Sequence, residues 1–325
     1  VPITPRWKPL VATGRTACGA PNLQNMPREG GWRECLQPRP GTVYINADYN
    51  TIELRALAQT CLDWFGRSAL AEAMNNGVDP HLLLASDILG ISYEDAVARK
   101  KDKEVKSSRQ MSKAANFGYP GGLGASSFAA YAKASYKVIL SEQEARRLKD
   151  LWLHRWPEMG LYFQRVNRNI NGGTVRMTEE GPEKSYQLVQ PVSLRLRGGT
   201  GYCDGCNSYF QGRTADGAKW ALFCVSMEGL LGYSPLWPAS KGVSPLYGYH
   251  PVILAHDEIV CEGPEEQPRV SLAASRLSSC MIEAMQEHIE DIVILAEPAI
   301  MRLYSKDAES TRQEDGTLSI WEPSL

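Results

Sequence analysis

Regularly spaced cations mark one segment of this sequence as a candidate phosphate binder. In RQMSKAANFGYPGG, residues 109–122, Arg109, Lys113 and Phe117 follow one another at intervals of four. At 3.6 residues per turn, this spacing places all three on one face of a helix, which the Pro-Gly-Gly run would end. Such a face could bind a polyphosphate through its cations and stack on a base through its ring. The simpler alternative is a solvated basic stripe over a core Phe.

Two apolar segments each carry an aspartate where a strand is expected to end. Asp48 closes the strand pattern TVYINAD, and Asp257 lies in the polar tip of YHPVILAHDEIVCEG, residues 249–263, which is typical of a β-hairpin. If these strands are neighbours, the two like charges need a cation between them. Oxygen ligands favour Mg²⁺ or Mn²⁺, and two such ions could support phosphoryl transfer. Taken singly, each aspartate is better explained as a turn or cap residue, and only the combination with the basic helix indicates a nucleotidyl-transfer site.

The length, net charge and cysteine content of the chain exclude several classes of protein. With 325 residues, the chain is long enough for one large domain or two to three ordinary ones. A net charge of -2 gives no overall evidence for a nucleic-acid partner, although residues 99–113 carry seven cations against two anions. Only Cys203 and Cys206 form a CxxC pair, which favours reduced thiols over a zinc site. The sequence shows no membrane-length apolar run and no signal-peptide pattern, so we expect a soluble, cytoplasmic protein.

The elements that must position these residues follow from hydrophobic periodicity. Residues 1–40 are rich in Pro, Gly and Asn and indicate extended or looping chain. A strand at 42–48 is followed by helical periodicity to Phe65, and residues 69–170 are mostly helical, with breaks at 75–77, 90–92 and 118–124. Next we expect a strand at 193–197, helices at 206–231 and 269–290, and the hairpin between them. The candidate core positions of the first helix are Ile52, Leu54, Leu57, Ala58 and Cys61.

Five segments in fixed order resemble the motifs of the family A DNA polymerases, the type of bacterial DNA polymerase I and many phage replicative enzymes. DYNTIELR at 48–55 resembles motif A, RQMSKAANFG at 109–118 resembles motif B, and HDE at 256–258 resembles motif C. TGR with NLQN, at 13–15 and 22–25, and the N-x-x-x-Q-G pattern at 207–212 are similar to two supporting signatures. FGYPGGLG and ADGAK look closest to phage members, for which the location would be the host-cell cytoplasm.

The resemblance implies an α+β right-hand polymerase fold, with an antiparallel palm sheet and a largely helical fingers subdomain. Residues 1–60 would form the N-terminal part of the palm with motif A, residues 61–200 the fingers with the motif B helix, and residues 201–325 the C-terminal part of the palm with motif C. The family places a thumb, and often a 3′ to 5′ exonuclease, before TGR, where this sequence has only twelve residues. We therefore expect neither part in this chain, weak DNA binding and low processivity, unless a second chain supplies them, as in a split polymerase.

The resemblance also implies a metal site. Asp48 and Asp257 would hold two Mg²⁺ ions, for which Mn²⁺ could substitute, with the Tyr49 carbonyl as an extra ligand. Glu258 would flank the ions as a further catalytic carboxylate.

For the nucleotide, the resemblance implies that Arg109 and Lys113 hold the incoming triphosphate and that Lys113 donates a proton to the departing pyrophosphate. Phe117 would pack on the nucleotide and His81 would lie near the phosphates. Glu53 would crowd the ribose 2′ position and so favour deoxyribonucleotides. The residues expected at the primer-template DNA are Arg15, Asn22, Gln24, Asn25, Asn207, Gln211 and His256.

Two positions depart from the family pattern. Gly121 stands where the family commonly has a Tyr that helps to guard the template position, and Cys203 stands where an Arg usually precedes the N-x-x-x-Q motif. The first departure is expected to affect fidelity, and the second to remove one minor-groove contact to the DNA.

The leading hypothesis is template-directed DNA synthesis, in which the primer 3′ hydroxyl attacks the α-phosphate of a bound dNTP. A single-subunit RNA polymerase shares this architecture, but Glu53 and Phe117 argue against it. A two-metal nuclease would need only Asp48 and Asp257 and would leave the basic helix unexplained. A non-catalytic DNA-binding or assembly subunit that retains the fold is the remaining alternative.

Overall fold

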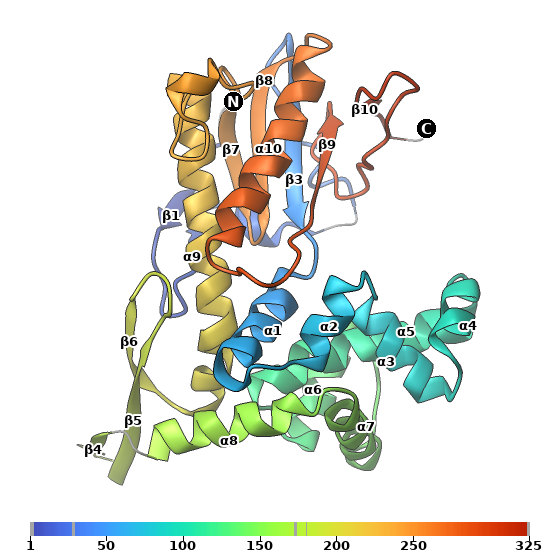
Figure 1. Ribbon diagram of the computed structural model, residues 1–325, viewed down its shortest axis with the longest axis vertical. Coiled ribbons are helices and arrows are strands. Elements are labelled where there is room, and N and C mark those ends of the chain that lie inside the picture. The colour runs from blue at the N-terminus through green and yellow to red at the C-terminus, as the bar shows by residue number, and fades with distance from the viewer. Residues whose placement is uncertain (1–2, 28–29, 172–173, 180, 324–325) are drawn as a thin grey trace. The chain divides into compact units, whose positions relative to one another are not determined.

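The computed structural model describes residues 3–27, 30–171, 174–179 and 181–323, and its chain divides into two compact units (Figure 1). Unit 1 comprises Val1–Ile52, Thr214–Glu290 and Ile294–Leu325, and unit 2 comprises Glu53–Arg213 and Asp291–Val293. The boundaries predicted from the sequence, after residues 60 and 200, differ from these. Each unit mixes helices and strands, so the predicted α+β class is confirmed.

Unit 1 is built on a five-stranded sheet in the order β10-β9-β3-β8-β7. Its strands are β3 (Thr42–Tyr49), β7 (His250–Ala255), β8 (Glu258–Pro264), β9 (Ala296–Met301) and β10 (Ile320–Trp321). The central strand β3 pairs antiparallel with β8 and β9, whereas the short β10 runs parallel to β9. Residues 43–47 of β3 are all buried, because the sheet is covered on both faces. The predicted strand and hairpin are therefore confirmed.

Unit 1 also contains helix α10 (Arg269–Gln286) and the C-terminal part of the long helix α9 (Tyr202–Leu231). Helix α10 packs on β3 and β9 (Figure 1). It ends before the predicted residue 290, because the chain turns at Met285, whose carbonyl accepts the N–H groups of His288 and Ile289. Helix α9 begins earlier than the predicted Cys206, since the carbonyl of Gly201 accepts a hydrogen bond from Gly205 N–H and adds one turn.

The N-terminal segment of unit 1 is mainly irregular, as its composition predicts. Its short elements are β1 (Arg6–Lys8), β2 (Ala17–Gly19) and the 3-10 turn η1 (Leu23–Asn25). A second 3-10 turn, η3 (Ala239–Lys241), follows α9. Between β9 and β10 runs a long loop, residues 302–319, whose side chains reach the carboxylates described below.

Unit 2 is mostly helical, as the sequence predicts. Its helices are α1 (Ile52–Phe65), α2 (Ala69–Asn75), α3 (Pro80–Leu89), α4 (Tyr93–Ala98), α5 (Lys103–Gly118), η2 (Tyr119–Gly121), α6 (Ala125–Tyr136), α7 (Glu142–Arg155) and α8 (Glu158–Asn171). All three predicted breaks occur. The five candidate core residues of α1 are each at most 3% exposed, which confirms its predicted buried face. In the part of the chain that the structure describes, no helix is long and apolar enough to cross a membrane.

The strand predicted at 193–197 is placed wrongly, and two strands before it were missed. Unit 2 contains a three-stranded sheet of β4 (Thr174–Thr178), β5 (Gly181–Val189) and β6 (Leu196–Thr200). Residues 191–195 form the connection instead, where the φ of Leu194 is +53° and the Gln190 N–H donates to the Arg195 carbonyl. β5 begins with Gly-Pro and lacks apolar alternation, so its extended form depends on pairing with both neighbours.

Candidate functional site

The predicted carboxylates of unit 1 meet at one end of the paired strands β3 and β8. Asp48 lies opposite Glu258 in the antiparallel register. Asp257 occupies the two-residue turn between β7 and β8, and its carbonyl accepts a hydrogen bond from the Tyr49 N–H at 3.3 Å. The other turn residue, His256, has a φ of +60°, which makes the reversal tight. The sheet register therefore brings the three acidic residues together.

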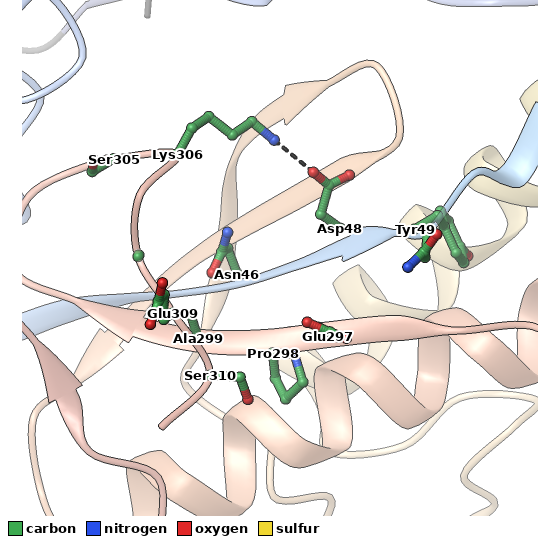
Figure 2. A pocket seen from close by; sticks show the side chains of 12 residues that line it. Asn46, Asp48, Tyr49, Glu297, Pro298, Ala299, Ser305, Lys306, Glu309 and Ser310 are labelled. Carbon is green, nitrogen blue, oxygen red and sulfur yellow. Dashed lines mark hydrogen bonds and ion pairs between the residues drawn. The ribbon is translucent and has the colours of Figure 1, made fainter. Parts of the chain in front are cut away.

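Glu258 is completely buried and fully engaged. The Asn46 amide donates to its Oε1 at 2.6 Å, and the Tyr304 hydroxyl donates to its Oε2 at 2.8 Å. Lys306 Nζ lies 2.7 Å from the same Oε2. It also lies 2.8 Å from Asp48 Oδ2, the contact drawn in Figure 2. Tyr304 and Lys306 belong to the loop after β9 and carry no motif in the sequence, which is why sequence reasoning missed them.

The charges of this cluster do not balance. Burial, followed by repulsion from Asp48, raises the pKa of Asp257 to about 7, although Lys306 and Arg15 act in the opposite direction. Burial acts to lower the pKa of Lys306, but the charges of Glu258 and Asp48 raise it above its ordinary value. Lys306 is therefore protonated at neutral pH, and the cluster keeps excess negative potential that a cation would relieve.

The donor set of this cluster fits a hard divalent cation. Asp48 Oδ1 is buried and has no hydrogen-bond partner among the described residues. Within the same residues, no three His, Cys, Asp or Glu side chains are grouped as a complete metal site. Mg²⁺ is commonly held by only one or two carboxylates, and it takes its other oxygens from water and substrate phosphates. Two aspartates with a main-chain carbonyl meet that requirement.

A pocket of about 520 Å³ opens beside Asp48 (Figure 2). Tyr49 also lines it, but its hydroxyl donates to the Met281 carbonyl at 2.6 Å and its ring is buried. Only the main-chain carbonyl of Tyr49 remains for the predicted ligand role. The pocket is lined by residues of β3 and the turn after it (Asn46, Asp48, Tyr49, Asn50), of β9 (Glu297, Pro298, Ala299) and of the following loop (Ser305, Lys306, Ala308, Glu309, Ser310).

The predicted DNA-contacting residues of the N-terminal segment lie around the same hairpin. The buried Gln24 amide donates to the Leu254 carbonyl of β7 and to the Thr16 hydroxyl, each at 3.3 Å. The Asn22 side chain caps η1 by accepting the Gln24 N–H at 3.1 Å. Asn22 and Asn25 are exposed. Gln24 therefore anchors this segment to the hairpin, while the two asparagines present their side chains outward.

Arg15 and His256 interact electrostatically with the acidic residues of this cluster. Burial lowers the pKa of Arg15, while the charge of Asp257 opposes that change. Burial, and then the positive charges of Arg15 and Lys306, lower the pKa of His256. The exposed His256 ring is therefore neutral at physiological pH and can serve as a hydrogen-bonding group rather than as a cation.

The basic face predicted in unit 2 exists on helix α5. Arg109, Lys113 and Phe117 are each partly exposed, whereas Ser112 and Asn116 between them are buried. The helix ends at Gly118 and passes into η2, close to the predicted Pro-Gly-Gly stop. The four-residue spacing thus places two cations and one ring along an accessible strip of the helix.

Arg109 has an acidic partner that sequence reasoning missed. Its Nε and Nη2 donate to Asp79 Oδ2 at 3.0 and 2.8 Å. Asp79 also caps helix α3, since its Oδ1 accepts the N–H groups of His81 and Leu82 at 2.9 and 3.2 Å. The Asp-Pro pair at 79–80 is a helix-start signal that could have identified the cap. No local signal indicated the ion pair with a residue 30 positions later.

His81 is buried between α3 and α5 and faces the basic strip. Its Nδ1 lies 3.1 Å from the Asn116 amide nitrogen, and its ring centroid lies 5.4 Å from that of Phe117. Burial, together with the charges of Arg109 and Lys113 and against the opposing charge of Asp79, lowers the pKa of His81 to about 4. Its Nε2 is buried and has no hydrogen-bond partner in the described ranges. A neutral imidazole with one uncommitted nitrogen is therefore available beside the cations.

The remaining predicted residues of unit 2 are Glu53, Asn207 and Gln211. Glu53 lies in the first turn of α1, and all three side chains are partly exposed. The Asn207 amide donates to the Cys203 carbonyl at 2.9 Å. A Cβ atom on Gly121 would come within 2.9 Å of Asn207 Oδ1. A side chain at this position, where the glycine departs from the family pattern, would therefore crowd the Asn207 amide.

Comparisons with known proteins agree with this architecture. The sequence profile described as DNA polymerase family A matches residues 3–296. The DNA polymerase I of Aquifex aeolicus is 28% identical over 309 residues, which cover 94% of this chain and 46% of that protein. The DNA polymerase I of Caldicellulosiruptor bescii is 27% identical over 298 residues, which cover 90% of this chain and 30% of that protein. The chain thus spans less than half the length of these relatives.

A solved structure shares the fold. It is described as the POL domain of Pol1 from M. smegmatis in complex with DNA primer-template and dNTP. The TM-score is 0.65 at 22% sequence identity, and the match covers 93% of this chain and 48% of that chain. This likeness confirms the predicted polymerase fold.

Proposed function

Because the chain belongs to DNA polymerase family A, we propose that it carries the catalytic part of a DNA-directed DNA polymerase. Its reaction would transfer dNMP from a dNTP to a primer 3′ hydroxyl. The observation that carries this proposal is the meeting of Asp48, Asp257 and Glu258 at the ends of paired strands within the matched residues. Unit 1 would act as the palm and unit 2 as the fingers. Primer-template DNA and dNTP, which the M. smegmatis domain binds in its solved complex, would be the partners.

The carboxylate cluster of unit 1 would hold divalent cations through Asp48, Asp257 and the Tyr49 carbonyl. Bound Mg²⁺ ions would polarise the attacking hydroxyl and stabilise charge on the departing oxygens. Glu258 would orient this cluster, because its hydrogen bonds from Asn46 and Tyr304 fix its position beside Asp48. Buried, hydrogen-bonded supports of this kind keep ligands in place.

The strip of α5 would bind the triphosphate. Arg109 and Lys113 supply positive charge along one helix face, and Asp79 holds the Arg109 guanidinium in a defined orientation. The Asn116 amide faces Nδ1 of the neutral His81, so this ring would donate a hydrogen bond from Nε2 to a phosphate oxygen. Lys113 would donate a proton to the pyrophosphate as it leaves. Phe117, which packs beside His81, would stack on the nucleotide.

Selectivity for the sugar would come from Glu53 at the start of α1. A carboxylate beside the ribose would crowd a 2′ hydroxyl and disfavour ribonucleotides. Glu53→Ala should therefore raise incorporation of NTPs relative to dNTPs while retaining extension with dNTPs. The contacts to primer and template would come from the exposed Asn22, Asn25 and His256 with Arg15 and Gln24 in unit 1, and from Asn207 and Gln211 in unit 2.

The test is extension of a labelled primer on a DNA template by the purified chain with Mg²⁺, comparing dNTPs with NTPs. Extension should require dNTPs and should be lost in Asp257→Ala, while DNA affinity stays within about twofold of the wild type. The matched control is Asp315→Ala, which removes a carboxylate from an exposed turn where Asp315 bonds only within 315–317 among the contacts described.

Each other outcome selects an alternative. A preference for NTPs would favour an RNA polymerase, and shortening of the primer would favour a nuclease. A folded chain that binds DNA without extending it would favour a non-catalytic subunit. Extension that appears only with a second polypeptide would favour the split-polymerase form of the proposal.

A further inference from the structure

Lys306 is placed as a counter-ion for the carboxylate cluster. Its Nζ lies 2.8 Å from Asp48 Oδ2, the contact drawn in Figure 2. The same Nζ lies 2.7 Å from Glu258 Oε2, and the lysine side chain is only 19% exposed. Surface ion pairs are often incidental, but this ammonium contacts two carboxylates at once, and one of them is completely buried. The bridge therefore belongs to the cluster itself.

The loop that carries Lys306 is anchored by the two residues that precede the lysine. The Tyr304 N–H donates to the Leu36 carbonyl at 3.1 Å, and its hydroxyl donates to Glu258. The Ser305 hydroxyl donates to Glu34 Oε1 at 3.3 Å. The backbone thus delivers the lysine to the carboxylates, and the flexible stem of its side chain is the part that can move.

A monovalent ammonium and a divalent cation cannot both take the same oxygens. Lys306 engages Asp48 Oδ2, while Asp48 Oδ1 has no hydrogen-bond partner in the part of the chain described. With Arg15 included, two positive charges face the three negative charges of Asp48, Asp257 and Glu258.

We propose that Lys306 is a built-in counter-ion that competes with divalent cations for the Asp48 carboxylate, and so sets the metal concentration at which the cluster fills. This inference rests on the proposed metal-binding role of the cluster. When a cation binds, Lys306 leaves Asp48 Oδ2 and turns toward the adjoining pocket, which it already lines. Glu297 and Glu309 line that pocket too and offer carboxylates for the displaced ammonium.

The test is direct binding of Mn²⁺ to the full chain without DNA or nucleotides, measured by the electron paramagnetic resonance signal of free Mn²⁺ and by calorimetry. Lys306→Met should bind Mn²⁺ at least about tenfold more tightly than the wild type, within the range usual for two coupled ligands. Lys306→Arg keeps the charge and should bind like the wild type. Arg312→Met is the matched control, because it removes one positive charge from the same loop, where Arg312 bonds to the Gly316 carbonyl. If the Met variant fails to fold by circular dichroism, Lys306→Gln replaces it with the same expected gain.

Asp48→Asn distinguishes the metal-binding role of the cluster from the competition by Lys306. If Asp48→Asn abolishes Mn²⁺ binding but neither uncharged Lys306 variant binds more tightly than the wild type, Lys306 is only a structural partner and the inference is overturned. If Asp48→Asn leaves Mn²⁺ binding unchanged, the metal-binding role of the cluster is itself wrong, and the competition falls with it. A tighter Met variant together with an unchanged Arg312→Met supports the competition.

Discussion

Replacing Asp257 with asparagine should stabilise the metal-free protein at alkaline pH. The native pKa of Asp257 is about 7, which lies about 3 above the ordinary value of 3.8. A change of one in pKa corresponds to about 1.4 kcal/mol of free energy. A carboxyl with a raised native pKa binds its proton more readily when folded, so its contribution to stability is present at low pH and is lost as pH rises through 7. Asp257→Asn mimics the protonated form. Its advantage over the wild type should therefore grow by roughly 3 kcal/mol between pH 5 and pH 8, with about 4 kcal/mol as the upper limit.

The assay is chemical denaturation in EDTA at pH 5, 6, 7 and 8, with the difference between variant and wild type as the measured quantity. Asp315→Asn is the control, because hydrogen bonds from the Thr317 hydroxyl and N–H lower the pKa of Asp315 and it stays ionised across this range. Its effect should be the same at every pH. A constant difference between Asp257→Asn and the wild type would refute the argument that burial and Asp48 destabilise the ionised carboxylate. Added Mg²⁺ should stabilise the wild type but not the variant.

Three further predictions concern the supports of the two units. Arg276→Met should destabilise unit 1 by about 3–5 kcal/mol in denaturant unfolding, because it leaves the completely buried Glu228 without its charge partner. In the wild type, Arg276 Nη2 and Nε donate to Glu228 Oε1 and Oε2 at 2.7 and 2.9 Å. A loss below about 1 kcal/mol would contradict this prediction. The His81 ring should titrate with a midpoint near pH 4 in an NMR pH series, whereas a midpoint near 6.5 would mean that the ring is solvated. Because the native pKa is lowered, the contribution of the neutral ring to stability is present above about pH 6.5 and is lost as the pH falls toward 4. Gly121→Ala should cost roughly 1–3 kcal/mol, because the new methyl group would lie 2.9 Å from Asn207 Oδ1, and adding Asn207→Ala should recover most of that loss in the same unfolding assay.

Local patterns predicted the elements that carry the chemistry. The apolar run before Asp48 and the paired runs around Asp257 predicted β3 and the β7–β8 hairpin, and the four-residue spacing of Arg109 and Lys113 predicted the accessible face of α5. These predictions succeeded because strand and helix periods appear directly in the order of side chains. They failed at β4 and β5, where sheet pairing rather than side-chain alternation maintains the extended chain.

What the sequence by itself determined is which residues carry charge, and on which helix face or strand end each one stands. The tertiary structure alone decided their partners. Lys306 reaches Asp48 across 258 positions and Asp79 reaches Arg109 across 30, and neither pairing leaves a trace in the spacing of nearby residues. The physical reason is that an ion pair depends on distance in space and on burial, both of which arise only when sheet register and helix packing bring remote segments together.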